Sequence, residues 1–74
     1  MNVMEKISEI LAEKIDISVE DVGPESSFED MGLDSLDVVE LAMTLEEAFG
    51  VKIELNEPVK TVGELTILIE DLLN

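Results

Sequence analysis

A serine inside a short acidic stretch is the strongest chemical candidate in this 74-residue chain. The stretch is Asp30-Met-Gly-Leu-Asp-Ser-Leu-Asp37, in which Ser35 follows Asp34 directly. A serine acts as a nucleophile when a neighbouring base activates it, but the sequence has no histidine, and no lysine lies near Ser35. The absence of cysteine excludes thiolate metal sites, so any thiol chemistry must come from a cofactor. We therefore expect no catalytic residue and no metal site.

A helix cap is the simplest interpretation of the same residues. Asp34 or Ser35 can cap the first turn of a helix, and Asp37 then stabilises the positive end of that helix. For a serine taken alone, capping is by far the more frequent role. The residue types around Ser35 therefore fit a structural role as well as a chemical one.

Three segments of the chain have the apolar spacing of amphipathic helices. They are Val3–Ile15, Leu36–Phe49 and the segment that follows the capping box Thr61-Val-Gly-Glu64. Asn2 is the expected N-cap of the first helix, and Gly50 is the expected stop of the second. The spacing predicts an all-α fold, a small bundle with three main helices.

The connections between these helices differ in length. The first runs from Asp16 to Asp34, and we expect Phe28 and Leu33 to hold this long loop against the core. After the second helix, residues 51–55 alternate like a strand but have no partner strand, so we expect an extended loop. Asn56-Glu57-Pro58 is expected to form a short or vestigial fourth element.

The charge balance restricts the possible partners. The chain has 19 acidic residues against four lysines, a net charge of −15, while 46% of its residues are apolar. That apolar share predicts one folded domain over residues 1–74. The lysines are too few for nucleic-acid binding, and no apolar run approaches the ~20 residues that span a bilayer. The negative field favours a monomer with basic protein partners. Because Met1 to Ile10 lacks a signal-peptide layout, we expect a cytoplasmic protein.

Longer patterns around Ser35 point to a known family. The run Phe28–Leu41, together with Leu45-Glu-Glu-Ala-Phe-Gly50, resembles the acyl carrier protein family, and so do the length, the acidity and the long first loop. In that family the serine of the Asp-Ser-Leu motif, here Asp34, Ser35 and Leu36, receives 4′-phosphopantetheine from coenzyme A through a separate transferase. The resemblance implies a single acyl carrier domain whose Ser35 is modified. The thiol of the arm then holds acyl groups as thioesters.

The resemblance also implies a docking surface on the second helix. In the family, matching positions bind basic patches of a phosphopantetheinyl transferase and of the acyl-transferring and synthase enzymes of fatty acid or related lipid and polyketide synthesis. Here those positions are Asp37, Val39, Glu40, Met43, Glu46 and Glu47. Without the resemblance, the same acids are an ordinary solvated helix face.

Family members can also shelter an attached acyl chain between their helices. The aliphatic residues available for such a space are Leu41, Ala42, Ile53, Val59 and Leu65, although core packing is the better expectation for each. Core packing is also the expected role of Phe28, Leu45 and Phe49.

The sequence departs from the family pattern after Ile53, where the segment is shorter than usual and contains Pro58. This departure leaves open a specialised carrier, for example of an aminoacyl group. An unmodified acidic interaction module is a second alternative, because an intact Ser35 is necessary but not sufficient for modification. A calcium-binding module fits less well, since the acids lack alternate-residue ligand spacing and a loop-closing glutamate.

Overall fold

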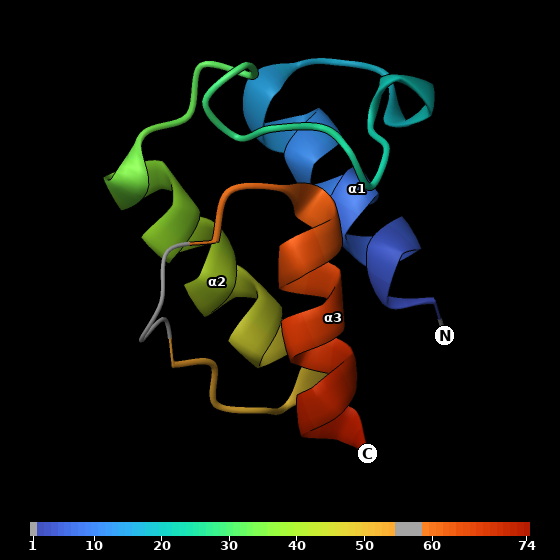
Figure 1. Ribbon diagram of the computed structural model, residues 1–74, viewed down its shortest axis with the longest axis vertical. Helices are drawn as coiled ribbons and strands as arrows, with labels where there is room; N and C mark the ends of the chain where they lie inside the picture. Colours follow the sequence, from blue (N-terminus) through green and yellow to red (C-terminus); the bar gives the residue numbers. More distant parts are fainter. Residues whose placement is uncertain (1, 55–58) are drawn as a thin grey trace.

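The protein is helical throughout its regular structure. The computed structural model describes residues 2–54 and 59–74, and these contain three α-helices and one short 3₁₀ helix. The helices are α1 (Val3–Ile15), η1 (Val19–Asp21), α2 (Ser35–Phe49) and α3 (Val62–Leu73). Figure 1 shows the connection between α1 and α2 crossing one end of the helices, while the C-terminus lies at the opposite end.

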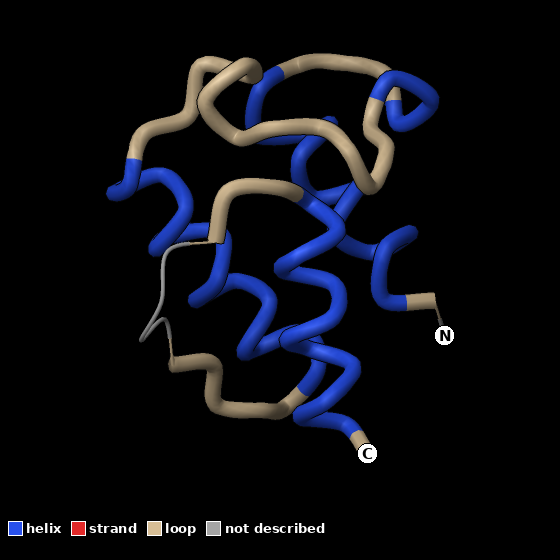
Figure 2. Tube along the Cα trace, in the orientation of Figure 1, coloured by secondary structure: helices blue, strands red, loops and turns tan. Residues whose placement is uncertain are grey.

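The prediction of an all-α fold with three main helices is confirmed in the described ranges, which contain no strand (Figure 2). Residues 51–54 form a loop, as expected. The sequence did not predict η1, because a three-residue helix carries no periodic apolar signal. The expected fourth element at Asn56-Glu57-Pro58 lies outside the described residues. None of the helices described is long and apolar enough to cross a membrane.

The α-helices begin and end at or next to the residues that the sequence predicts. The Asn2 side chain accepts a hydrogen bond from the backbone N–H of Glu5 at 3.1 Å, which caps α1. Gly50 ends α2 with a left-handed φ of 67°, a conformation that glycine adopts without steric cost. The second helix begins at Ser35 rather than at Leu36. The serine is therefore part of the first helical turn.

The core lies where the apolar stripes of the helices meet. Its most deeply buried side chains come from all three α-helices and are Ile7, Leu11, Leu41, Leu45, Val62, Leu65 and Ile69. Phe28 and Leu33 of the connection are also buried, as predicted, whereas Phe49 is only partly buried. Burying a large apolar side chain stabilises a fold by about 1.5–3 kcal/mol. These two side chains therefore hold the connection against the helices.

Hydrogen bonds also tie this connection to the start of α3. The backbone N–H of Val62 donates to the Ser26 carbonyl at 3.0 Å, and that of Gly63 donates to the Pro24 carbonyl at 2.9 Å. A Cβ at Gly63 would lie 2.8 Å from the same Pro24 oxygen, so only glycine fits this close approach. The contacts fix the path along which the chain enters α2.

Candidate functional site

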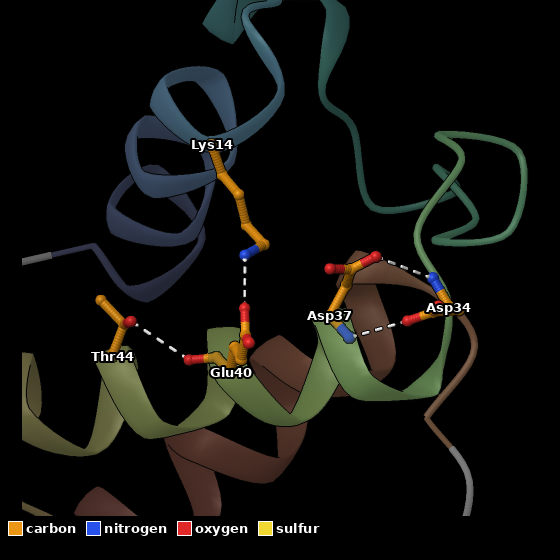
Figure 3. Close-up of polar contacts among 5 residues, drawn as sticks. All are labelled: Lys14, Asp34, Asp37, Glu40 and Thr44. Carbon is orange, nitrogen blue, oxygen red and sulfur yellow. Dashed lines mark hydrogen bonds and ion pairs between the residues drawn. The ribbon is translucent and has the colours of Figure 1, made fainter.

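Ser35 lies directly after the residue that caps α2. The backbone N–H of Asp37 donates to Asp34 Oδ1 at 3.0 Å, and the backbone N–H of Asp34 donates to Asp37 Oδ2 at 3.2 Å (Figure 3). These reciprocal bonds form a capping box, so the capping interpretation is confirmed with Asp34 as the N-cap. Ser35 itself is exposed, and no hydrogen bond joins its Oγ to another described residue. The helix therefore does not need the serine hydroxyl for its own start.

A tight turn delivers the chain to this helix start. The backbone N–H of Leu33 donates to the Phe28 carbonyl at 2.9 Å, which closes the turn between two buried side chains. Gly32 within the turn has a φ of 80°, in the left-handed region where other residues are strained. The buried pair and the glycine together present Asp34 and Ser35 at the surface on a fixed backbone.

A hollow of about 430 Å³ opens beside Ser35. Its apolar lining comes from the connection, from α2 and from the segment before α3, and consists of Phe28, Leu33, Val38, Val39 and Val59. Its polar lining is Ser27, Glu29, Asp34, Ser35 and Lys60. Among the described residues, Lys60 is the only cation of this lining, and its carbonyl accepts from the Phe28 N–H at 3.0 Å.

The expected acyl-chain space differs from this hollow. Of the five aliphatic residues predicted for it, only Val59 lines the hollow. The other predicted residues, namely Leu41, Ala42, Ile53 and Leu65, are buried in the core. The alternative expectation of ordinary core packing is therefore confirmed for these four. Sequence spacing identifies buried positions but does not separate a filled core from an open hollow.

The outer face of α2 exposes a stripe of apolar side chains with acidic residues beside them. Leu36, Val39 and Met43 are 73%, 44% and 58% exposed. Glu40 and Glu47 are exposed on the same stripe, because residues three and four apart lie on one face of a helix. Large apolar groups on a monomer surface with a charged surround are typical of a protein interaction site.

Two of the predicted docking residues, Asp37 and Glu46, form hydrogen bonds that stabilise the fold. Asp37 is half-buried and belongs to the capping box. Glu46 is partly buried, and its Oε2 accepts a hydrogen bond from the backbone N–H of Ile53 at 2.7 Å. Glu46 thus ties down the loop after α2, apart from the stripe that contains Glu40 and Glu47.

Two cations near the site are not predicted by the sequence. Lys14 Nζ on α1 lies 3.1 Å from Glu40 Oε2 on α2, and Lys60 lines the hollow beside Ser35. Neither contact has a local sequence signal, because the partners lie far apart in the chain and meet only through folding. For the acidic residues, no group of three or more in the described ranges is placed to hold a metal ion.

This arrangement fits a phosphate-linked group on Ser35. The exposed hydroxyl lies at the N-terminal end of a 15-residue helix, where the helix dipole and unpaired N–H groups favour an anion. The hollow offers an apolar surface for a linear arm, and Lys60 offers a positive charge. Since the chain has no cysteine, such a group would also supply the missing thiol.

Known proteins with similar sequences agree with this geometry. The model of the family described as "Phosphopantetheine attachment site" matches residues 5–69. A relative described as "Acyl carrier protein" from Nitratidesulfovibrio vulgaris is 53% identical over 55 residues, which cover 73% of this chain and 72% of that protein.

The chain therefore belongs to the acyl carrier protein family. It is a carrier of acyl thioesters on 4′-phosphopantetheine and not an enzyme, as the sequence predicts. This function entails interaction with the transferase and synthase enzymes that load and use such a carrier.

Proposed function

We propose that Ser35 is the residue that carries 4′-phosphopantetheine, within a single carrier domain spanning residues 1–74. The observation that supports this most strongly is the exposed Ser35 hydroxyl, which the Asp34–Asp37 capping box leaves uncommitted at the start of α2. Asp34 and Leu36 complete the attachment motif. The serine can thus be modified without loss of the helix cap.

The chain's own residues prepare the attachment but do not catalyse it. The sequence has no histidine, and no hydrogen bond joins the Ser35 hydroxyl to a described carboxylate or amine, so its proton passes to a group of the phosphopantetheinyl transferase. The oxygen then bonds to the phosphorus next to pantetheine, and the pyrophosphate P–O bond of coenzyme A breaks to release adenosine 3′,5′-bisphosphate. The helix start and Lys60 would stabilise the resulting phosphodiester, and the apolar hollow would contact the arm. When bound, the arm supplies the thiol that forms acyl thioesters.

The exposed stripe of α2 is the proposed docking surface for these enzymes. Glu40 and Glu47 supply charge for a basic partner, while Leu36, Val39 and Met43 supply the apolar contact that is desolvated on binding. Asp37 contributes charge at the end of the stripe. We include Glu46 only as a weaker contributor, because its carboxylate already binds Ile53.

The chain acts as a monomer, since its net charge of −15 opposes self-association. The partners are a phosphopantetheinyl transferase and enzymes of fatty acid or related lipid and polyketide synthesis. The fourth helical element and the cytoplasmic location stay predictions. The apolar lining of the hollow favours an acyl cargo over an aminoacyl one.

Intact mass spectrometry tests the attachment residue. The chain is incubated with coenzyme A and a broad-specificity phosphopantetheinyl transferase. We expect one added phosphopantetheinyl mass in the natural chain and none in Ser35→Ala. Ser27→Ala is the matched control because Ser27 lines the same hollow, and it should be modified normally. Addition to Ser35→Ala would overturn the assignment. Failure of every variant with several transferases would favour the unmodified interaction module.

Transferase kinetics test the docking surface. Glu47→Gln removes one exposed charge of the stripe, and we expect kcat/KM for modification to fall by about two- to five-fold, since rim charges mainly set association rates. Glu70→Gln removes an exposed charge from α3 and should have a smaller effect. Equal effects of the two variants would mean that only the overall charge matters, and would contradict a surface on α2.

A further inference from the structure

The ion pair between α1 and α2 reaches into the proposed docking stripe. Lys14 Nζ lies 3.1 Å from Glu40 Oε2, and Figure 3 shows the lysine extending from α1 to the carboxylate on α2. We propose that Lys14 is an internal competitor of basic partner enzymes: it occupies Glu40 in the free protein and so limits how tightly a partner binds. This inference rests on the docking surface proposed above.

The exposures of the two side chains favour competition over a purely structural contact. The Lys14 side chain is 27% exposed, so its stem is largely covered, whereas the Glu40 side chain is 67% exposed. A partner can therefore approach the carboxylate while Lys14 is in place. Thr44 Oγ1 donates to the backbone carbonyl of Glu40 at 3.1 Å within the helix, so this bond leaves the carboxylate to Lys14 or to a partner.

The charge distribution makes this lysine unusual. The chain has four lysines against 19 acidic residues, so most carboxylates have no cation available. The other ion pair among the described residues joins Lys52 and Glu54 at 3.8 Å, in the loop after α2. Of the two pairs, only that of Lys14 involves a residue of the docking stripe.

The strength of the pair suits a displaceable contact. Exposed ion pairs stabilise proteins weakly and are screened by salt. A lysine or arginine of a partner can therefore replace Lys14 at Glu40, or share the carboxylate with it. Each replacement breaks the internal ion pair. A partner therefore binds the docking stripe more weakly than it would if Lys14 did not contact Glu40. The structure thus assigns a role in setting partner affinity to Lys14, a residue of α1 that lies outside the docking stripe.

A double-mutant cycle with a phosphopantetheinyl transferase tests this proposal. Association rate and Kd are measured for the full chain at low salt. We expect Lys14→Gln to bind about two- to five-fold more tightly, because Glu40 is then available from the start. Lys52→Gln makes the same change in net charge at a site off the stripe, so its gain should be clearly smaller. In a Glu40→Gln background, Lys14→Gln should give no more than the gain of Lys52→Gln.

Three results would distinguish a failure of the proposed competition from a failure of the docking surface. Equal gains for Lys14→Gln and Lys52→Gln, with a loss for Glu40→Gln, would overturn the competition and leave the docking surface intact. Unchanged binding in Glu40→Gln and Glu47→Gln would overturn both. A lower thermal midpoint for Lys14→Gln without tighter binding would show that the lysine only joins α1 to α2. Lys14→Arg, which retains the pair, should bind like the natural chain.

Discussion

Two helix starts in this protein use the same local motif but differ in what surrounds them. At α2, the side chains and backbones of Asp34 and Asp37 form a capping box. At α3, Thr61 and Glu64 do the same: the Glu64 N–H donates to Thr61 Oγ1 at 3.2 Å, and the Thr61 N–H donates to Glu64 Oε2 at 3.3 Å. Local sequence alone makes the two starts equivalent.

The two helix starts differ in their exposure to solvent. At α3 the connection covers the first turn, so that Val62 is fully buried and its N–H, like that of Gly63, binds a carbonyl of the connection. At α2 the corresponding residues Ser35 and Leu36 are exposed, and a hollow opens beside them. A capping box therefore makes a helix start stable, while tertiary surroundings decide whether that start is buried in the fold or open at the surface.

The largest expected effect comes from disturbing the covered start. In Gly63→Ala the new Cβ would meet the Pro24 carbonyl oxygen at 2.8 Å, so the connection must shift. Alanine favours helix over glycine by up to about 1 kcal/mol, but overpacking against backbone costs about 1–3 kcal/mol. We expect a net loss of about 1–2 kcal/mol in the free energy of unfolding, measured by urea denaturation.

Gly23→Ala is the control for that substitution. No atom lies within 4 Å of a Cβ placed at Gly23, and its φ is not left-handed. Its stability should stay the same or rise by about 0.4–1 kcal/mol, because alanine restricts the unfolded chain. Equal losses at both glycines would contradict the close contact at α3.

The two caps provide the next test, because they should separate stability from function. Thr61→Ala removes a cap and should lower the free energy of unfolding by about 1 kcal/mol with little change in modification rate. Asp34→Asn keeps a capping oxygen but removes a charge, so stability should change by less than about 0.5 kcal/mol. Its modification by the transferase should slow, since Asp34 adjoins Ser35. Urea melts and transferase kinetics on the same samples check both outcomes.

Ionic strength should have the smallest effect, with opposite signs for stability and function. Added salt screens the repulsion within a chain of net charge −15 and should raise Tm. A gain of about 0.5 kcal/mol corresponds to roughly 2–4 °C in a domain of this size. The same screening should slow modification of Ser35 by weakening attraction to a basic partner. A modification rate that does not respond to salt would argue against charged docking at the exposed start.

The parts of this fold that sequence predicts are those that local interactions determine. The caps at Asn2, Asp34 and Thr61 each depend on a side chain within three residues, and the apolar stripes depend on helical period. The position of Ser35 at the start of α2 followed from the same local signals. The family resemblance then gave the chemistry that the residues alone left open.

The parts that sequence did not predict are contacts between distant residues. The Lys14–Glu40 pair and the placement of Lys60 on the hollow that Ser35 also lines both require the helices to be packed first. The same holds for the hollow, because Leu41 and Leu65 fill the core while Val38 and Val39 line the open space. Periodicity shows which residues face inward but not how completely they fill the interior.

Fragmentation mass spectrometry of the natural chain, after reaction with coenzyme A and a phosphopantetheinyl transferase, tests the central claim most directly. It locates the added group on a particular residue. We predict a single phosphopantetheinyl group on Ser35 at the exposed start of α2 and none on Thr61 at the covered start of α3. A group on any other hydroxyl, or no group while a known carrier is modified in the same reaction, would contradict the account.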